Sequence, residues 1–419
     1  MRPLARDGEV SYRLNAIIQE MCHELANSLT PQPEAIALTG SFARNEGSVL
    51  LAGDQVTVLG DIEFMVFFRS GVDLPQQQLV LNQHAQTFRS QLTEKKVECE
   101  LEFSAVTPEY LRTLRPQIFG YELLSHGKTV WGKKEVLAQA PRFPAKKIPR
   151  FDAWRMLNNR LLEQLQWADV IRQGNRAQLL RVFYQLLKCH IDIGTTLLVF
   201  AGMYENTYAA RALALRNWAT RLIGEDGLSF IPLLANRVAD CTAFKLSPNL
   251  TNHPLGVHLD TEDAEILRED VRRVSTELVP LALSAWRWEA AKLSGLPMDK
   301  PREDSELTAA VFQTQGWNEK LRGWAKLAAT PEVRHQRGFY RRAGSLLRRA
   351  SPRYLIYSVA SELYFNLPAV YSGSDPDVAR LERQLPVAFT EHFSEPRAWW
   401  RLRANVITGW RLFLRNHWT

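Results

Sequence analysis

The sequence predicts an α+β protein, with an N-terminal α/β domain (a short mixed sheet with flanking helices) and a large, mainly α-helical region after it. Three observations support this fold class. Short apolar runs alternate with helical patterns and turn residues between positions 34 and 132. Beyond position 150, apolar residues recur almost entirely at helical spacing. The composition, 46% hydrophobic and 23% charged, is that of an ordinary globular protein.

The length of 419 residues predicts more than one domain, because single cores rarely grow past about 250–300 residues. The Pro- and Lys-rich segment PRFPAKKIPR, residues 141–150, is typical of an interdomain linker. We therefore expect a first domain over residues 1–140, the linker 141–150, a helical domain over 151–300 and a basic helical C-terminal region over 301–419.

Targeting signals and cysteine usage predict a cytoplasmic protein. The N-terminal residues MRPLARDGEV lack the apolar core of a signal peptide. The longest uncharged apolar run, from Ile193 to Met203, is shorter than the roughly 20 residues that a membrane span needs. The four cysteines are scattered, which favours reduced core thiols over disulfides or a zinc site: Cys22, Cys99, Cys189 and Cys241.

The first half of the predicted sheet surrounds a Gly-Ser turn. Apolar spacing predicts a helix over residues 10–29, which Pro31 and Pro33 end. Residues 34–38 read as a short strand that enters the turn LTGSFARNEG. Glycines and alternating residues over 43–60 predict a loop with a small hairpin near Gly53. The run over 62–68 is typical of a buried strand.

The second half of the sheet brings an acidic strand. An amphipathic helix over 75–92 is followed by strict alternation over 97–106, which predicts a strand. A helical stretch and a short closing strand over 127–132 complete the domain. One face of strand 97–106 carries three acids, Glu98, Glu100 and Glu102. Such a face is either merely solvated or a source of a further carboxylate for a metal site.

Two carboxylates open the strand that follows the turn. Asp61 and Glu63 are one residue apart, so in a strand both side chains point to the same face. They would lie beside the free amides of the turn at Gly40 and Ser41. This arrangement suits a divalent cation bound to a phosphate ester.

The order of these motifs resembles the polymerase-beta-type nucleotidyltransferase superfamily. The shared pattern is an apolar strand with a Gly-Ser turn, here LTGSFARNEG, then D-I-E on a strand and a further acid on a following strand. GSFAR with a nearby acid-Gly is most similar to the small bacterial nucleotidyltransferases that modify antibiotics or proteins. The resemblance covers residues 30–135. The spacer between Ser41 and Asp61 is longer than usual, which we attribute to the hairpin near Gly53.

The resemblance implies roles for the residues of the turn and for the two acids that follow it. Gly40 and Ser41 would bind the triphosphate, while Asp61 and Glu63 would hold Mg²⁺ or Mn²⁺ as catalytic ligands. Arg44 has two open interpretations, a phosphate contact or an ion pair with Glu46.

The third acid of the pattern falls on strand 97–106. Glu102 precedes an apolar stretch that runs to Pro108, so it is the first choice for the third metal ligand and the general base. Glu100 is the second choice, because it shares the same face of the strand.

The helical region predicts a second possible contribution to the site. Helices are expected over residues 154–171, 179–203, 208–223, 262–293, 305–328, 334–349 and 354–365, with a loop-rich segment over 224–260. Lys188 and Tyr184 share one side of helix 179–203, and we expect them to project over the nucleotide. Alternatively, Lys188 forms an i,i+4 ion pair with Asp192.

Arginines concentrate in the C-terminal region. Residues 334–353 contain no acid and seven arginines, Arg334, Arg337, Arg341, Arg342, Arg348, Arg349 and Arg353. Seven equals the net charge of the whole chain, +7. Three interpretations stay open, namely a solvated helix face, a surface that grips RNA, or a surface on anionic lipid.

The last predicted helix, over residues 395–418, carries an apolar stripe of Trp399, Leu402, Val406, Trp410 and Phe413. Its other side carries Arg397, Arg401, Arg411 and Arg415. Such a helix either docks onto a helical bundle or makes peripheral contact with the inner membrane. Docking is the first choice.

These expectations converge on a Mg²⁺-dependent nucleotidyltransferase. It would move a nucleoside monophosphate, AMP from ATP by preference, onto an acceptor hydroxyl of a small molecule or a protein, with release of pyrophosphate. One alternative is nucleotide addition to an RNA end, with the Arg334–Arg353 segment as the grip. The other is a non-catalytic nucleotide-binding or scaffold protein that has the same fold.

Overall fold

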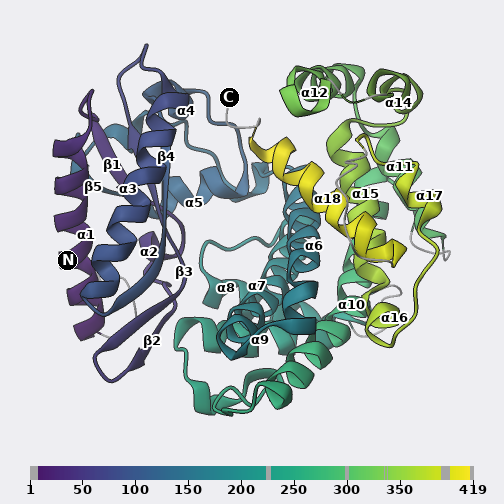
Figure 1. The fold of residues 1–419 in the computed structure, drawn as a ribbon, viewed down its shortest axis with the longest axis horizontal. Helices are drawn as coiled ribbons and strands as arrows, with labels where there is room; N and C mark the ends of the chain where they lie inside the picture. Colours follow the sequence, from purple (N-terminus) through teal and green to yellow (C-terminus); the bar gives the residue numbers. More distant parts are fainter. Residues whose placement is uncertain are drawn as a thin grey trace. The chain divides into compact units, whose positions relative to one another are not determined.

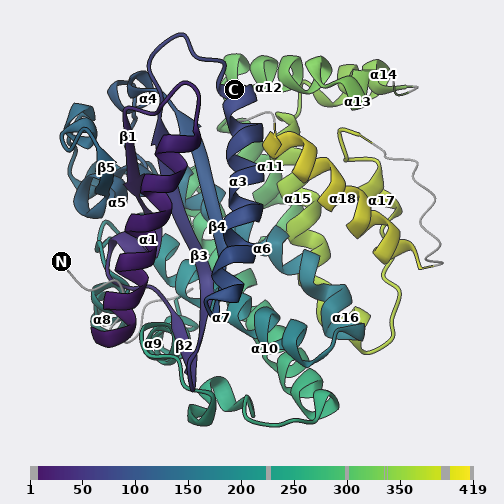
Figure 2. The ribbon, with the colours of Figure 1, turned by 60° about the vertical axis from the view of Figure 1, so that its left-hand side comes forward.

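A computed structural model describes residues 8–222, 228–297, 302–334, 336, 338–387 and 397–415 (Figures 1 and 2). The chain divides into two compact units. Unit 1 comprises Met1–Asp152, Ala201–Asn217 and Asn236–Leu255, and unit 2 comprises Ala153–Phe200, Trp218–Ala235 and Gly256–Thr419. The first boundary lies just after the predicted linker. Unit 1 also includes two later segments, and unit 2 shows no division near residue 300.

Unit 1 contains a five-stranded mixed sheet. Its strands are β1 (Ala35–Leu38), β2 (Val49–Ala52), β3 (Gln55–Phe67), β4 (Val97–Val106) and β5 (Lys128–Gly132). The 13-residue strand β3 organises the sheet, because β2 and β1 pair antiparallel with its two ends while β4 runs parallel along its other side. β5 extends the sheet beyond β1, also antiparallel. The predicted hairpin near Gly53 is present as β2 and the start of β3.

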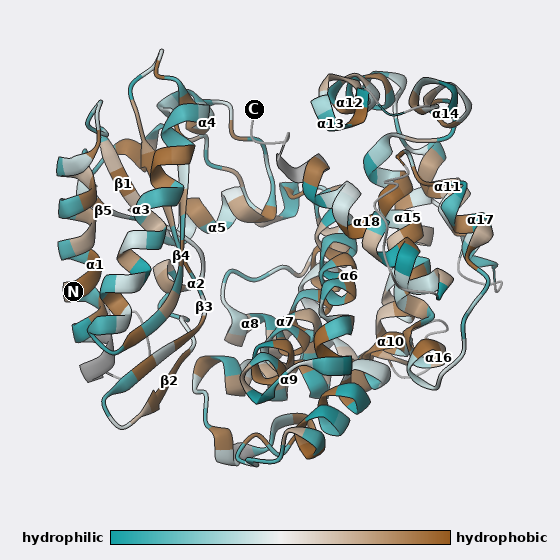
Figure 3. Cartoon of the chain, viewed as in Figure 1, coloured by the Kyte–Doolittle hydropathy of each residue, from teal (hydrophilic) through white to brown (hydrophobic). Residues whose placement is uncertain are grey.

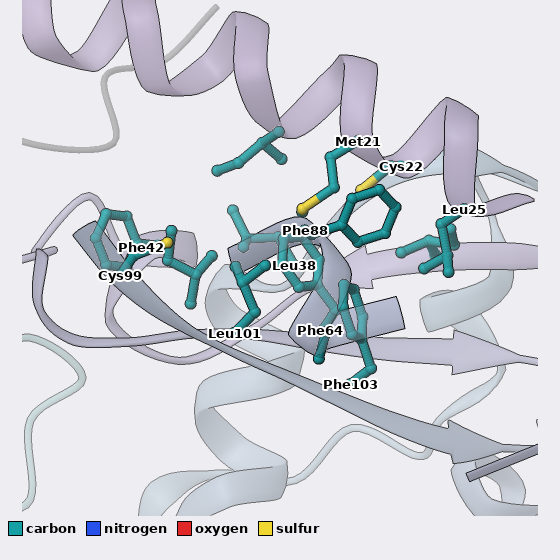
Figure 4. Packing of buried hydrophobic residues seen from close by; sticks show 14 of the residues in the cluster. Met21, Cys22, Leu25, Leu38, Phe42, Phe64, Phe88, Cys99, Leu101 and Phe103 are labelled. Carbon is teal, nitrogen blue, oxygen red and sulfur yellow. The ribbon is translucent and has the colours of Figure 1, made fainter. Parts of the chain in front are cut away.

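Helices cover both faces of this sheet. The helical elements of unit 1 up to the first boundary are α1 (Gly8–Ser28), α2 (Gly40–Ala43), α3 (Leu74–Glu94), α4 (Pro108–Arg112), α5 (Ile118–His126), η1 (Val136–Gln139) and η2 (Ala145–Lys147). Helices α1 and α3 lie on one face (Figures 1 and 2). Figure 4 shows this core, in which Met21 and Phe88 from the helices pack against Phe64 and Phe103 of the strands. A smaller cluster on the opposite face includes Met65 and residues of α4 and α5.

The alternation of β4 follows from these two faces. Cys99, Leu101 and Phe103 are buried in the core beneath α1 and α3, whereas the three acids between and beside them are exposed. Because successive side chains of a strand point to opposite faces, the acids lie on the other side of the sheet. All four cysteines are free and buried, as predicted, and burial raises the pKa of Cys22 and Cys99 to about 12.

The remaining elements are helical, mostly in unit 2. They are α6 (Arg150–Gln173), α7 (Arg176–Phe200), α8 (Tyr208–Ala219), α9 (Ile231–Leu246), η3 (Leu250–Asn252), η4 (Pro254–Gly256), α10 (Ala264–Ser294), α11 (Asp304–Gln313), α12 (Trp317–Ala329), α13 (Pro331–Arg334), α14 (Phe339–Leu346), α15 (Pro352–Phe365), α16 (Leu367–Tyr371), α17 (Ala379–Glu382) and α18 (Ala398–Arg415). In the described part of the chain no helix is both long and apolar enough to cross a membrane.

Three sequence expectations were wrong in this region. The helix expected over 334–349 is shorter, because Arg334 ends the separate helix α13 and α14 begins at Phe339. The segment 224–260, predicted to be loop-rich, contains the 16-residue helix α9. Its Pro232 sits in the first turn, where a proline removes no helical hydrogen bond. The single helix expected over 305–328 is two helices, α11 and α12, which are separated at Gly316. Glycine is a poor helix former, so the break falls there.

Helix α18 docks within unit 2. Trp399, Leu402, Val406 and Trp410 are all buried, and the indole of Trp399 donates to the carbonyl of Leu363 at 3.2 Å. Phe413 and Arg415 have side chains outside the described residues. Arg403 donates to the carbonyl of Leu165 at 2.5 Å, so the helix is also fixed by polar contacts. The apolar face that the membrane interpretation required is therefore occupied by the protein itself.

Candidate functional site

The parallel pairing of β3 with β4 sets the geometry of the predicted acids. Asp61 pairs with Glu100, and Glu63 pairs with Glu102. Between Thr57 and Asp61 the register shifts, because β3 has two more residues than β4 over this stretch. The irregularity comes just before the acidic positions. Such interruptions in a ladder re-aim the side chains that follow them.

Three of the predicted acids converge on one point. One carboxylate oxygen each from Asp61, Glu63 and Glu102 lie within 4.8 Å of one another. Asp61 and Glu63 are partly buried and Glu102 is exposed, so the group is reachable from solvent. Carboxylate oxygens at this separation match the ligand type that Mg²⁺ prefers. Three negative charges so close repel one another, and a bound divalent cation would relieve that repulsion. We call these three residues the acid cluster.

Glu100, the second choice for the third acid, has a different partner. Its carboxylate forms an ion pair with Arg89 of α3 at 2.5 Å. Both side chains are substantially exposed, so this pair contributes little to stability. The position of Glu100 outside the acid cluster favours Glu102, the first choice, as the third ligand.

Gly40 lies directly against the acid cluster. Its φ is +64°, a conformation that residues with a side chain rarely adopt. A Cβ at this position would stand 2.2 Å from Oε2 of Glu63, far inside van der Waals contact. The backbone of Thr39 donates to the carbonyl of Glu63 at 2.8 Å, which joins the end of β1 to β3. The turn therefore needs glycine for two independent reasons, its conformation and the space for Glu63.

The rest of the turn is closed by short-range contacts. Ser41 is partly exposed, and its carbonyl accepts from the backbone N–H of Glu46 at 2.9 Å. Gly47 packs against the ring of Phe42, where a Cβ would come within 2.5 Å of a ring carbon. Asn45 has φ +63° and accepts from Nζ of Lys128 at 2.5 Å. The loop LTGSFARNEG is thus held at both ends.

Arg44 is placed in a buried ion-pair network. Its guanidinium pairs with Glu46 at 3.2 Å and with Glu122 of α5, and it lies 4.7 Å from the ring centroid of Tyr208. Of its two sequence interpretations, the ion pair with Glu46 is present, although it is buried and not on the surface. Burial alone would lower the pKa of Arg44, but Glu122 and Glu46 raise it above its ordinary value.

Glu122 is the centre of this network. It also forms an ion pair with Arg211 and accepts from the hydroxyl of Tyr204 at 2.8 Å. Burial alone would raise the pKa of Glu122, but Arg44 and Arg211 lower it to about 2. The carboxylate is therefore charged at neutral pH. We call Arg44, Glu46, Glu122, Tyr204 and Arg211 the Glu122 network.

Segments that are distant in sequence join unit 1 through this network and through a separate hydrogen bond of Ser48. The backbone N–H of Tyr208 donates to Glu46 at 2.9 Å, and the hydroxyl of Ser48 donates to the carbonyl of Lys245 at 2.7 Å. These contacts explain why Ala201–Asn217 and Asn236–Leu255 belong to the same compact unit as the sheet. No local sequence pattern pointed to Glu122, Tyr204, Arg211 or Lys245, because these residues lie far along the chain from the turn that they contact.

Lys188 and Tyr184 lie in α7 of unit 2. Tyr184 is buried, and Lys188 is half-buried. The alternative partner of Lys188, Asp192, forms an ion pair with Arg160 of α6 at 2.6 Å. The assignment of Lys188 and Tyr184 to nucleotide binding stays a prediction.

Comparisons with known proteins add no further assignment: the chain matches no protein-family model, no curated protein and no solved structure.

Proposed function

We propose that the protein is a Mg²⁺-dependent nucleotidyltransferase that moves a nucleoside monophosphate, AMP from ATP by preference, onto an acceptor hydroxyl. The observation that carries this proposal is the convergence of Asp61, Glu63 and Glu102 beside the glycine turn at Gly40. Two adjacent strands deliver three oxygen ligands to one point, at the end of a strand whose next residues form a tight turn. A small molecule or a protein is our first choice of acceptor.

The residues present fit a divalent cation. Their donors are carboxylate oxygens only, and at least one carboxylate is exposed to solvent. When bound, Mg²⁺ or Mn²⁺ supplies neutralisation of the triphosphate charge and lowers the pKa of the attacking hydroxyl. Asp61 and Glu63 would be the principal ligands and Glu102 the third. Gly40 and Ser41 would lie along the phosphates, because Gly40 lies directly against the acid cluster that would hold the metal.

The reaction can be written with these residues in named roles. The acceptor oxygen attacks the α-phosphorus of the nucleoside triphosphate, and the bond from that phosphorus to the β-phosphate oxygen breaks. Pyrophosphate leaves. Glu102 would accept the hydroxyl proton, because it is the exposed member of the acid cluster, whereas Asp61 and Glu63 are partly buried.

The experiment that tests this proposal is a transfer assay. Each α-labelled nucleoside triphosphate is incubated with the protein, Mg²⁺ or Mn²⁺, and cell extract, and label is then measured in protein, RNA and small molecules. We expect the double variant Asp61→Asn/Glu63→Gln to lose at least about a hundredfold in rate, because metal-based stabilisation is worth several kcal/mol.

Glu100→Gln is the matched control, because it removes a carboxylate from the same strand face outside the acid cluster. We expect it to retain the wild-type rate within a few-fold, while Glu102→Gln loses most activity. Transfer that survives in the double variant would show that the acid cluster is not the catalytic centre.

A further inference from the structure

The surface formed by α12 and α14 in unit 2 is unusual in both charge and hydrophobicity. Residues 317–350 contain nine basic residues and two acidic ones, a difference of seven that equals the net charge of the whole chain. The excess of positive charge is therefore concentrated on one part of the molecule. Both hydrophilic and hydrophobic residues occur along these helices (Figure 3).

Helices α12 and α14 form one continuous surface. Their facing sides are joined by Trp324 and Phe339, whose ring centroids are 6.2 Å apart. The indole of Trp324 donates to the carbonyl of Ala350 at 2.9 Å, and Nζ of Lys320 donates to the carbonyl of Arg348 at 3.2 Å. Figures 1 and 2 show the two helices next to each other. These contacts hold α12 against α14 and the residues that follow it.

The two helices also carry large apolar side chains that are exposed. Trp317 is 57% exposed, Leu321 is 50% exposed and Tyr340 is 66% exposed. Trp317 and Leu321 are four residues apart, so they form a ridge along one side of α12. Seven other large hydrophobic residues are exposed in the described part of the chain, each on a different element. Among the described residues, α12 is the element that carries two of these exposed side chains.

Exposed cations are carried by the same two helices and by the residues just after α14. Arg322 and Lys326 follow Trp317 and Leu321 along α12, while Arg341, Arg348 and Arg349 are exposed on and just after α14. Two other arginines of the sequence cluster are structural, since Arg342 and Arg353 are half-buried and Arg342 donates to the carbonyl of Leu385 at 3.4 Å. Arg337 lies outside the described residues.

We propose that the α12–α14 surface binds an anionic lipid bilayer at its interface. The exposed cations match lipid phosphates, and each Lys or Arg close to an anionic membrane contributes about 1 kcal/mol. Tryptophan and tyrosine are enriched at membrane interfaces, where one part of the ring contacts acyl chains and the polar part contacts water. Leu321, the aliphatic residue of the ridge, favours a bilayer over a nucleic acid as the partner. A nucleic acid stacks its bases on Trp317 and Tyr340 but gains little from Leu321, whereas a bilayer interface accepts all three.

This proposal replaces the predicted membrane contact of α18, whose apolar stripe is buried in unit 2. It is independent of the nucleotidyl-transfer proposal, because it rests on a different surface. A variant of the α12–α14 surface is therefore expected to keep its transfer rate on substrates in solution.

The experiment is co-sedimentation of the full chain with vesicles. One set contains phosphatidylcholine alone, and the other contains about one third phosphatidylglycerol. We expect binding to the anionic vesicles that weakens as salt is raised, and little binding to the neutral ones. Replacing two cations, Arg341→Gln with Arg349→Gln, should weaken the partition coefficient roughly 30-fold, the equivalent of about 2 kcal/mol.

A matched control removes the same charge from α18. Arg401→Gln with Arg411→Gln alters two exposed arginines of unit 2, and we expect less than about a threefold effect on vesicle binding. Trp317→Ser with Leu321→Ser should weaken vesicle binding roughly tenfold, because it removes apolar contact. This loss should be the same at low and high salt. Thermal unfolding of each variant checks that the fold is kept.

Three outcomes would overturn the proposal. The first is equal binding to neutral and anionic vesicles, and the second is equal loss in the α18 control. The third is tight binding of a labelled single-stranded RNA of about 20 nucleotides, measured by fluorescence anisotropy, that the Arg341/Arg349 variant loses while vesicle binding is absent in the wild type. That result would assign the surface to nucleic acid.

Discussion

Carboxylates occur in two opposite environments in unit 1. In the acid cluster, three carboxylates lie within 4.8 Å of one another, partly open to solvent. In the Glu122 network, the buried Glu46 and the partly buried Glu122 each lie against a buried arginine. The residues Gly40 to Arg44 connect the two regions, because Gly40 touches Glu63 and Arg44 pairs with Glu122.

The charges of the Glu122 network stabilise the fold, whereas the like charges of the acid cluster destabilise it. Buried opposite charges fix the position of the segments that carry them, and the loss of one partner leaves the other uncompensated. Like charges held together gain nothing from the fold itself, so their convergence needs another explanation, such as a bound cation. By this argument the Glu122 network holds the loop, and the acid cluster is the place where ligand chemistry is expected.

The largest stability effect is expected when the network loses its central charge. Glu122→Gln would leave Arg44 and Arg211 without their shared carboxylate, and we expect a loss of roughly 3–5 kcal/mol in the free energy of unfolding. Chemical denaturation at pH 7 measures it. Glu100→Gln, which breaks an exposed ion pair, should cost less than about 1 kcal/mol.

The pH dependence of that effect has a defined sign. Because the pKa of Glu122 is lowered to about 2, its contribution is present above its unfolded pKa near 4.5 and is lost as pH falls towards 2. The cost of Glu122→Gln should therefore shrink below about pH 4. A cost that is the same at pH 3 and pH 7 would contradict the assignment of Glu122 as the charged centre.

Unit 2 contains a carboxylate in a third kind of environment. Glu289 of α10 in unit 2 is fully buried like a core residue, but among the described residues neither of its oxygens has a well-aligned hydrogen-bond partner. Burial raises the pKa of Glu289 to about 8, and Thr196 offsets part of this effect. Burial without a cation thus shifts a glutamate in the direction opposite to the shift of Glu122.

We expect Glu289 to make the protein less stable as pH rises. Between about pH 4.5 and pH 8 the folded state holds a proton that the unfolded state releases, so the free energy of unfolding falls with pH in that window. At pH 7 the effect amounts to roughly 3 kcal/mol. Glu289→Gln should remove it, so its stability relative to wild type should rise from pH 5 to pH 8. Parallel pH profiles of the two proteins would contradict this.

Gly40→Ala tests the contact between the turn and the acid cluster. The added methyl group must displace Glu63 and adopt a positive φ, which costs roughly 1–2 kcal/mol for the conformation alone. Gly53→Ala is a close control, because Gly53 has φ +59° but nothing within 4 Å of an added Cβ. Both variants should lose similar stability from strain, and only Gly40→Ala should also lose transfer activity. Equal activity in both would separate the turn from the site.

The smallest expected change in stability comes from binding of the cation. If the acid cluster binds Mg²⁺, a concentration ten times the Kd stabilises the folded state by about 1.4 kcal/mol, which a thermal shift assay detects. The double variant Asp61→Asn/Glu63→Gln should lose this shift. Glu122→Gln should show the same shift, although its melting temperature without Mg²⁺ is lower than that of the wild type. A shift that is unchanged in the double variant would place Mg²⁺ binding elsewhere.

Much of the fold follows from patterns that are local in the sequence. Alternation over β4 and helical spacing over α1, α3, α7 and α10 predicted those elements close to their observed bounds. The failures have local causes too. Helix α9 lies inside the segment that was expected to be loop-rich, with Pro232 in its first turn, and Gly316 divides a helical pattern that periodicity alone leaves continuous.

The sequence by itself determined the Gly-Ser turn, the pair Asp61 and Glu63 on one strand face, and an acidic strand downstream. These depend on residues a few positions apart, whose geometry the backbone fixes. Tertiary structure alone decided which acid joins them, because the parallel register of β3 and β4 sets Glu63 beside Glu102 and Arg89 takes Glu100. It also decided the place of Arg44, since Glu122 and Arg211 meet it only after segments far apart in the chain have packed together.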